Sequence, residues 1–462
     1  MVTRSFAETS ASWYVSLDRE AQHTPQERQS RSFACKVVLS IVQTVTLCSN
    51  VRTIPSSANP STREHVALIS CSMKVSCSLG ALLKAVDDLL GPEPACYHRD
   101  AAGERHQPWP DFQTLTLSAS KDRLTVMGTF YGVTAEVTLP ATTGAQGAVD
   151  VRSSPFRHLL NGLLSGLAQA DNDRVELSVQ PDKLFLTTGR SVAWIFSSVR
   201  LNTEAEQLDE APHPLPVQGV EESFRRTLYA VGTNGKLHPA FRALHLSQAA
   251  NIFTATGSDG NVLACFTVCC ADARESPLSR IGLPRESAEL LLRMFRHHRN
   301  ESVDLRVCPT YCSWTFSDGS RLTSRSVTDK APDFSAATPQ RDNFLQIQHK
   351  TFQQAIGMFG RADNPSILVS AQKSRGELSL TGTHHTEAQL STVVPIAGNP
   401  AQWKGKFSAR YLSDICEHGF GEGTGVIDIS MGSRLQEPLV FRSSGYVVVL
   451  MPQESKPSDY RA

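Results

Sequence analysis

The chain repeats one strand pattern three times, and this repeat restricts its fold more than any other feature of the sequence. Two strands joined by a turn are predicted in "LTLSASKDRLTVMGT", "LHLSQAANIFTATGS" and "ILVSAQKSRGELSLTGT". These stretches end at Thr129, Ser258 and Thr383, which are 129 and 125 residues apart. A period of this length is that of a whole domain, so the repeat predicts three copies of one domain in a single chain.

A second landmark has nearly the same period. The stretches "VELSV", "VDLRV" and "IDISM" alternate apolar and polar residues, as half-buried strands do. They begin at Val175, Val303 and Ile427, at spacings of 128 and 124 residues. Because two separate landmarks share one period, the repeat extends over most of the chain.

Two amphipathic helices are predicted in each copy, with apolar residues at steps of three and four. The first helices are predicted from Leu82, Phe224 and Phe352. The second helices are predicted from Pro155, Pro284 and Ser408, where Pro or Ser occupies a favourable helix start. Each copy therefore reads strand, helix, strands, helix, strands. This order predicts an α+β fold with helices packed on sheets.

Polar segments with proline separate the copies. They are "NTEAEQLDEAPHPLP" from Asn202 and "PDFSAATPQRD" from Pro332. We place domain boundaries near 207 and 340, which gives domains at 73–207, 208–340 and 341–462, the last with a short C-terminal tail.

Residues 1–72 match no part of the repeat, and two interpretations remain open. The segment is either a disordered tail or an incorrectly assigned start before Met73, or it is a functional extension. The second interpretation rests on "FACKVVLSIVQTVTL" from Phe33, whose composition suits a strand. This apolar run is too short and too polar for a spanning helix and too far from the start for a signal peptide.

Charge and cysteine usage limit the function classes. Lys plus Arg and Asp plus Glu both number 45, so the net charge is zero and any contact with DNA must be local. The eleven cysteines do not have the paired spacing of a zinc site, which predicts buried, reduced thiols and a cytoplasmic location.

Motifs for catalysis are missing from the sequence. It contains no P-loop, no G-x-S-x-G and no H-E-x-x-H. The Gly-rich "HGFGEGTG" from His418 is interpreted as a loop, and "THH" from Thr383 as a surface strand end. We therefore predict a non-catalytic binding protein without metal or cofactor.

Four stretches resemble one family. "MKVSCSLGALLKAVDDLLGP" from Met73, "SDGNVLACF" from Ser258, "APDF" from Ala331 and "GYVVVLMP" from Gly445 follow one another in the order found in bacterial DNA polymerase III β sliding clamps. The resemblance implies a divergent clamp, in which three domains form half of a six-domain ring. It also implies a first residue at Met73.

The resemblance implies a function as well. Such a ring encircles duplex DNA, is placed there by a clamp loader, and tethers the replicative DNA polymerase for processive synthesis. The alternative is a specialised second copy, from a plasmid or phage, that acts as a partner-binding platform outside the main replisome.

Basic residues on the predicted helices are the candidates for phosphate contacts, which orient a ring without reading sequence. Arg105 joins them because the family carries an arginine before a proline in this loop. The predicted DNA-contacting set is Lys84, Arg105, Arg157, His158, Arg225, Arg226, Arg293, Arg296 and Lys350.

The resemblance also implies one apolar pocket between the second and third domains, where polymerase and clamp-loader subunits bind through short apolar peptides. The matching positions are Phe241 on a predicted strand, Ser258, Gly260, Asn261, Val262, Leu263, Pro332, Ala337, Val449, Met451 and Pro452. Asn261 and Val262 replace a His-Arg pair of the family, and the tail from Gln453 is longer than is usual there.

A dimer is the expected assembly, because three domains make half a ring. Two chains are expected to meet head to tail, the first domain of one against the third of the other. Trp194, on a predicted strand late in the first copy, is the candidate interface residue, with a core position as the alternative.

Overall fold

The computed structural model describes most residues from Met73 to Gln453. Its longest gaps lie at 92–111, where only β2 (His98–Arg99) and β3 (Arg105–His106) are described, and at 200–211 and 271–277. In a fourth gap, at 330–343, only Phe334 and Thr338 are described. Residues 1–72 and 454–462 lie outside the description. The interpretations of the N-terminal segment and the boundaries near 207 and 340 therefore stay predictions.

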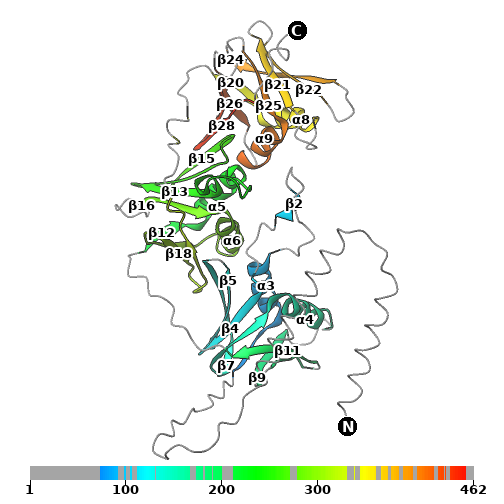
Figure 1. The fold of residues 1–462 in the computed structure, drawn as a ribbon, viewed down its shortest axis with the longest axis vertical. Coiled ribbons are helices and arrows are strands. Elements are labelled where there is room, and N and C mark those ends of the chain that lie inside the picture. The colour runs from blue at the N-terminus through cyan, green and yellow to red at the C-terminus, as the bar shows by residue number, and fades with distance from the viewer. Residues whose placement is uncertain are drawn as a thin grey trace, which may run out of the picture. The chain divides into compact units, whose positions relative to one another are not determined.

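The first copy of the repeat contains two helices, and its strands other than β2 and β3 belong to one continuous sheet (Figure 1). Its remaining elements are β1 (Lys74–Ser78), α3 (Leu79–Leu90), β4 (Thr114–Ser120), β5 (Arg123–Phe130), β6 (Val133–Pro140), β7 (Thr142–Ala145), β8 (Gly147–Arg152), α4 (Ser153–Gly166), β9 (Arg174–Gln180), β10 (Lys183–Thr187) and β11 (Val192–Val199).

The second copy follows the same order, with short 3₁₀ turns added. Its elements are β12 (His213–Pro216), α5 (Val217–Thr227), η2 (Leu228–Ala230), η3 (Pro239–Arg242), β13 (Ala243–Ala249), β14 (Ile252–Ser258), β15 (Val262–Cys269), β16 (Leu278–Pro284), α6 (Arg285–Phe295), β17 (Ser302–Val307), β18 (Tyr311–Thr315) and β19 (Arg321–Arg325).

The third copy differs chiefly in its last helix, which continues as a π-helical turn. Its elements are β20 (Phe344–Gln348), α8 (His349–Gly357), β21 (Ser366–Gln372), β22 (Glu377–Thr383), β23 (Gln389–Pro395), β24 (Ala397–Gly398), β25 (Trp403–Ser408), α9 (Ala409–Asp414), η4 (Ile415–Gly419), β26 (Val426–Ser430), β27 (Leu439–Ser443) and β28 (Tyr446–Leu450). The α+β expectation of repeated sheets with two helices each is confirmed.

Local chemistry explains most helix boundaries. The Ser78 hydroxyl accepts a hydrogen bond from the Ala81 amide at the start of α3, and Gly91 ends the helix with a φ of 73°. The helix predicted from Phe224 is placed too late, because α5 begins at Val217 and passes into a 3₁₀ turn after Thr227. Its N-terminal half, "VQGVEES", has too few apolar residues to announce a helix in the sequence.

The copies are joined by strand pairing. Within the large sheet, β19 of the second copy pairs with β6 of the first. Likewise, β28 of the third copy pairs with β15 of the second. All these strands run antiparallel, so each junction continues a sheet from one copy into the next.

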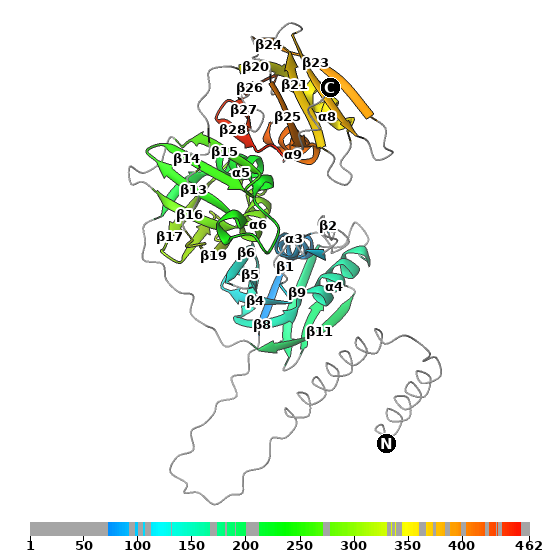
Figure 2. The same ribbon diagram turned by 45° about the horizontal axis from the view of Figure 1, so that its top comes forward.

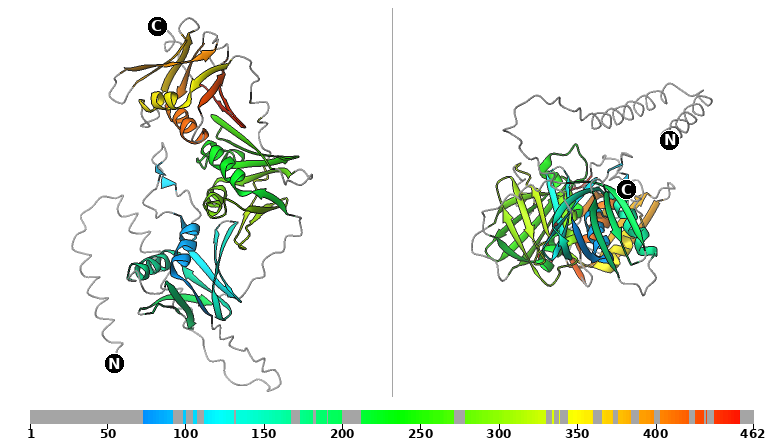
Figure 3. Two further views of the ribbon diagram at one scale, coloured as in Figure 1. Left: turned by 180° about the vertical axis from the view of Figure 1, so that it is seen from behind. Right: turned by 90° about the horizontal axis from the view of Figure 1, so that it is seen from below.

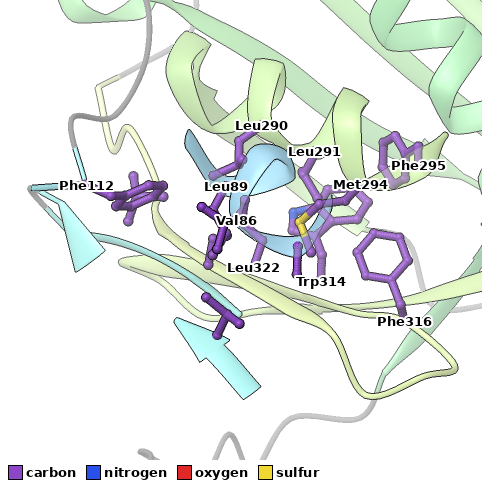
Figure 4. Close-up of a cluster of buried hydrophobic side chains, with 14 of the residues drawn as sticks. Val86, Leu89, Phe112, Leu290, Leu291, Met294, Phe295, Trp314, Phe316 and Leu322 are labelled. Atoms are coloured by element: carbon purple, nitrogen blue, oxygen red, sulfur yellow. The ribbon is translucent and has the colours of Figure 1, made fainter. Parts of the chain in front are cut away.

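Helix packing reinforces the first junction. Figure 4 shows Val86 and Leu89 of α3 beside Leu290 and Leu291 of α6, with Met294 next to them. All these side chains are buried in one apolar cluster that contains residues of both copies. Apolar burial of this kind stabilises the junction by about 25 cal/mol for each Å² removed from water.

The helices form one continuous row. In contact order the row is α4, α3, α6, α5, η4 with α9, and α8. Figure 2 shows α3 next to α6, and the same order can be followed from behind in the left panel of Figure 3, from blue through green to orange and yellow. One helical surface therefore passes through all three copies.

Candidate functional site

Four of the predicted DNA-contacting residues are exposed on the helix row or at a helix end and form no ion pair with another described residue. Lys84 lies on α3, His158 on α4 and Lys350 on α8, while Arg296 follows α6 directly. These side chains come from three different copies of the repeat, and contacts between successive helices connect the helices that carry them.

Carboxylates on the same helix or on the adjacent helix pair with other basic residues of the helix row. Arg157 Nε lies 2.7 Å from Asp87 Oδ1, and Arg226 Nε lies 2.6 Å from Glu222 Oε1. Arg225 pairs in the same way with Glu221. A phosphate therefore has to compete with a carboxylate for each of these arginines.

Arg293 differs from the rest of the predicted set because it is buried, with 9% of its surface exposed. Its Nη1 donates to the main-chain oxygen of Asp88 at 3.2 Å, near the C-terminal end of α3. Burial lowers the pKa of this guanidinium to about 10. Arg293 thus joins α6 to α3, and we leave it out of the DNA-contacting set. Arg105 lies on β3, and its side chain lies outside the described residues.

The predicted partner pocket centres on a small apolar cluster, which we call the junction cluster: Leu263, Phe334, Val440 and Val449. Leu263 and Val449 face each other across the β15–β28 pair. Phe334 comes from the linker between the second and third copies and covers the other three side chains. Met451 is 45% exposed beside them, and its amide donates to the Asn261 oxygen at 2.8 Å.

Hydrogen bonds hold the tight turn next to the junction cluster. Asp259 Oδ1 accepts from the amides of Asn261 and Val262 at 2.8 and 3.0 Å. Gly260 has a φ of 92°, a conformation that favours glycine, and its amide donates to the Ser258 hydroxyl at 3.2 Å. The rim of the candidate site is therefore held by hydrogen bonds from its own amides to its own side chains.

Two of the predicted pocket positions are placed differently from expectation, and two lie outside the described residues. Phe241 lies in η3 and not on a strand, since Pro239 starts a 3₁₀ turn there. Val262 is buried in the core of the third copy and does not face the junction cluster. Pro452 is only partly exposed, whereas Pro332 and Ala337 lie outside the described residues.

Sequence reasoning missed two aromatic residues of this site. Phe334 stands inside the "APDF" stretch that carried the resemblance, but only its neighbours were selected. Tyr411 on α9 donates from its hydroxyl to Asp259 Oδ2, and its oxygen accepts from Asn261 Nδ2 at 3.4 Å. Nothing in the sequence signals Tyr411, because its contact joins residues 152 positions apart.

Among the described strands, β11 and β23 each present an edge that pairs with no other strand of the chain. In β11, residues Val192 to Phe196 pair only with β10, and β23 pairs only with β22. Trp194 is 48% exposed on β11, next to Val192 at 68% and Phe196 at 66%. The Lys183 amino group lies 4.3 Å from the Trp194 ring centre. Trp194 is therefore not a core residue.

The free edge of β11 is equivalent to the edges of β19 and β28 that form the two internal junctions. The free edge of β23 is equivalent to the edges of β6 and β15. On one side of each junction, one strand residue pairs with a buried residue of its own hairpin; these residues are Ala193, Leu322 and Val448. On the other side, each residue pairs back onto a glycine of its own hairpin; these residues are Ala135, Ala264 and Leu390.

Both internal junctions use the same register. Leu322 lies opposite Ala135 at the first junction, and Val448 lies opposite Ala264 at the second. All four residues are fully buried. Their counterparts at the free edges, Ala193 and Leu390, are only partly buried.

The described residues between Met73 and Gln453 offer neither a metal-binding cluster nor a membrane-spanning helix. No group of three or more His, Cys, Asp or Glu side chains among them could hold a metal ion. Among the helices described between Met73 and Gln453, none combines the length and apolar character that crossing a membrane requires.

No protein-family model matches the chain, and no curated protein matches it in sequence. Solved structures do match. The DNA polymerase III subunit β from Pseudomonas aeruginosa is 16% identical, with a TM-score of 0.69, over 83% of this chain and 100% of that one. The sliding clamps from Caulobacter crescentus and Bacillus subtilis are 19% and 18% identical, each with a TM-score of 0.68 over the same shares.

These matches span the whole length of the known clamps, and the part of this chain left over is close in length to residues 1–72. The strand–helix order, the two junctions and the continuous helix row agree with that likeness. The fold of this chain is that of the bacterial DNA polymerase III β sliding clamp, as the four sequence stretches predicted.

Proposed function

We propose that this chain is a sliding clamp: two copies close into a ring around duplex DNA, and a clamp loader places the ring there. The ring then tethers the replicative DNA polymerase for processive synthesis. A closed ring is held on DNA by topology and needs little affinity for it. The balanced charge of the chain and the carboxylate-paired arginines of the helix row suit such weak, exchangeable contacts.

The observation that carries the proposal is the shared register of the two internal junctions. Leu322 opposite Ala135 and Val448 opposite Ala264 are two instances of one interface. The third instance needs Ala193 of one copy opposite Leu390 of another, because no described strand of the same chain occupies either edge. An exposed strand edge with apolar residues favours pairing with another chain.

Phosphate contacts are assigned to the exposed cations of the helix row. Lys84, His158, Arg296 and Lys350 form no ion pair with another described residue, whereas Arg157, Arg225 and Arg226 would exchange a carboxylate for a phosphate. A helix row that passes through three copies offers such groups along its whole length. Contacts of this kind orient the duplex and carry no sequence information.

Partner peptides are assigned to the surface of the junction cluster around Leu263, Val449 and Met451. An apolar peptide side chain that lies against these residues removes Met451 from water, and a flexible thioether adapts to varied partners. Polymerase and clamp-loader subunits would compete for this one surface through short apolar peptides. Such a protein has no catalytic step of its own.

Retention on circular DNA tests the proposal. The clamp is loaded with its clamp loader onto a nicked circular duplex, which is then cut once. We expect the protein to stay on the circle after a high-salt wash and to leave the linear molecule within minutes, because only topology holds it. Equal retention on both molecules, or none on the circle, would contradict a sliding clamp. A primed circular template then checks that the polymerase makes longer products with the clamp present.

A further inference from the structure

We propose that the C-terminal tail, residues 453–462, carries an aromatic anchor, Tyr460, that docks on Trp194 and Phe185 of the second copy and fastens the ring at the junction between chains. This inference rests on the proposed ring. It extends it by naming a segment of the chain that binds there and the residues that receive it.

The linker after β19 and the tail after β28 match in sequence. The linker reads "VTDKAPDF" over 327–334, and the tail reads "QESKPSDY" over 453–460. Lys, Asp and an aromatic residue fall at the same places: Lys330 and Lys456, Asp333 and Asp459, Phe334 and Tyr460. The two segments are offset by 126 residues. The strands before them, β19 and β28, have the same offset, since Ser324 in β19 is equivalent to Leu450 in β28.

The linker and the tail make equivalent backbone hydrogen bonds where they leave their strands. The Val327 amide donates to the Gly282 oxygen at 2.7 Å, and the Gln453 amide donates to the Lys406 oxygen at 2.8 Å. Gly282 and Lys406 each stand two residues before the end of the equivalent strands β16 and β25. The tail thus begins where the linker begins, and both aromatic residues follow seven positions later.

The aromatic residue of the linker, Phe334, packs in the junction cluster. Phe334 covers Val440 and Val449, which are paired with each other across β27 and β28, and it also covers Leu263 on β15. Phe334 is only 8% exposed there. The linker therefore seals the outer face of the junction between the second and third copies.

The first copy has a face that corresponds to the one under Phe334, and it lies at the free edge of β11. Phe185 and Trp194 are paired with each other across β10 and β11, at the places that Val440 and Val449 have in the third copy. Gln389 on β23 has the place of Leu263. In the described part of the chain nothing comparable to Phe334 covers Trp194, which is 48% exposed. The tail of one copy, leaving β28, would reach Phe185 and Trp194 of the other as the linker reaches its own site.

This match explains why the free edge is aromatic. The corresponding pair at the first junction is Ser313 and Thr323, and the segment that follows β11, "RLNTEAEQLDEA", contains no aromatic residue. The strand pair at a junction is thus apolar or aromatic where the segment that reaches it carries an aromatic residue. It is polar where that segment carries none. The tail and the β11 face are therefore matched in chemistry.

A photo-cross-linker tests the contact directly in the full chain. p-Benzoylphenylalanine is placed at position 460, the protein is mixed with ¹⁵N-labelled wild type, and cross-linked tryptic peptides are identified by mass. We expect mixed-isotope links from residue 460 to the peptides 184–190 or 191–200, which contain Phe185 and Trp194. Links only to the third copy of the same chain, or no link in a sample that is dimeric, would overturn the proposal and leave the ring intact.

A second measurement gives the strength of the anchor. Tyr460→Ala is expected to raise the dissociation constant of the dimer about tenfold or more, as the loss of a buried aromatic ring does. Tyr460→Phe should keep the wild-type value, since the linker uses Phe, and Arg461→Ala serves as a matched control outside the repeated motif. An unchanged constant for Tyr460→Ala would contradict the anchor. A wild-type protein that stays monomeric would instead remove the ring and this inference with it.

Discussion

The Arg293 guanidinium donates to the main-chain oxygen of Asp88 and so ties the end of α3 to α6. The contact crosses from the first copy of the repeat to the second. At the same place His297 Nε2 lies 3.0 Å from the Asp88 carboxylate. A positive group at the C-terminal end of a helix also stabilises the helix dipole. A residue that looked like a DNA contact in the sequence is therefore part of the scaffold.

Arg293→Ala should lower the free energy of unfolding by about 3 kcal/mol, because it removes a buried charged group from a joint between two copies. Urea unfolding followed by circular dichroism measures this loss. Arg296→Ala is the matched control, and as an exposed residue it should stay within about 0.5 kcal/mol of wild type. Equal losses for the two variants would mean that the contact with Asp88 contributes nothing.

Replacing Lys84 and Lys350 together by Gln should weaken binding to short linear duplex DNA and make it less sensitive to salt. Each lost phosphate contact lowers the slope of log K against log salt by about 0.9. Fluorescence anisotropy at several salt concentrations gives the slope. Lys236→Gln is the control, because Lys236 is exposed in a loop away from the helix row. A slope equal to that of wild type would remove both lysines from the DNA-contacting set.

Met451→Asp should abolish peptide binding while the protein stays folded. The substitution places a carboxylate where an apolar side chain has to dock, and a penalty of about 3 kcal/mol weakens binding more than a hundredfold. Titration calorimetry with an apolar polymerase C-terminal peptide measures the effect. Ile252→Asp, at another exposed apolar position, should bind like wild type. A large drop in melting temperature for Met451→Asp would show a core role instead.

Leu390→Asp should convert the dimer into a folded monomer. Its counterparts Ala135 and Ala264 are fully buried at the internal junctions, so an ionised group there would be desolvated on closure. Light scattering gives the mass, and a thermal melt confirms that the monomer is folded. Val426→Asp, exposed on β26, should remain dimeric. A dimer that survives Leu390→Asp would contradict the register with Ala193.

His245 should make stability fall at acid pH. Burial lowers the pKa of this imidazole, whose Nε2 lies 2.7 Å from the Ala240 oxygen and whose ring lies beside Phe334. The unfolded chain then takes up a proton that the folded chain refuses. Stability is present above the ordinary pKa of His, about 6.5, and is lost as pH falls through the lower folded pKa. Melting temperatures from pH 7.5 to 5 should decline less for His245→Gln than for wild type or for the exposed-site control His158→Gln.

The repeat was readable in the sequence because strand landmarks keep their spacing even where side chains differ. The alternation at Val175, Val303 and Ile427 predicted β9, β17 and β26. The α5 start was not readable, since its first turn has few apolar residues and is stabilised by tertiary packing.

Site residues were harder to predict than the fold. Phe334 and Tyr411 reach the candidate partner site through contacts between distant parts of the chain, and such contacts leave no local pattern. No sequence pattern separates Arg293, which is buried, from Arg296, which is exposed three residues later. Helix periodicity separates such positions only when the packing face is known, and here that face is set by α3.

The free edges of β11 and β23 differ from each other, since β11 presents aromatic residues and β23 presents Leu390 and Val393. A contact between unlike edges is heterologous, and it ends only when the added chains complete a full turn. If the angle between copies drifted by a few degrees per junction, the same register would add chain after chain and grow a filament. In the proposed ring, contacts that fix one copy against the next, such as the one from Arg293 of α6 to Asp88 of α3, would therefore also act against polymerisation.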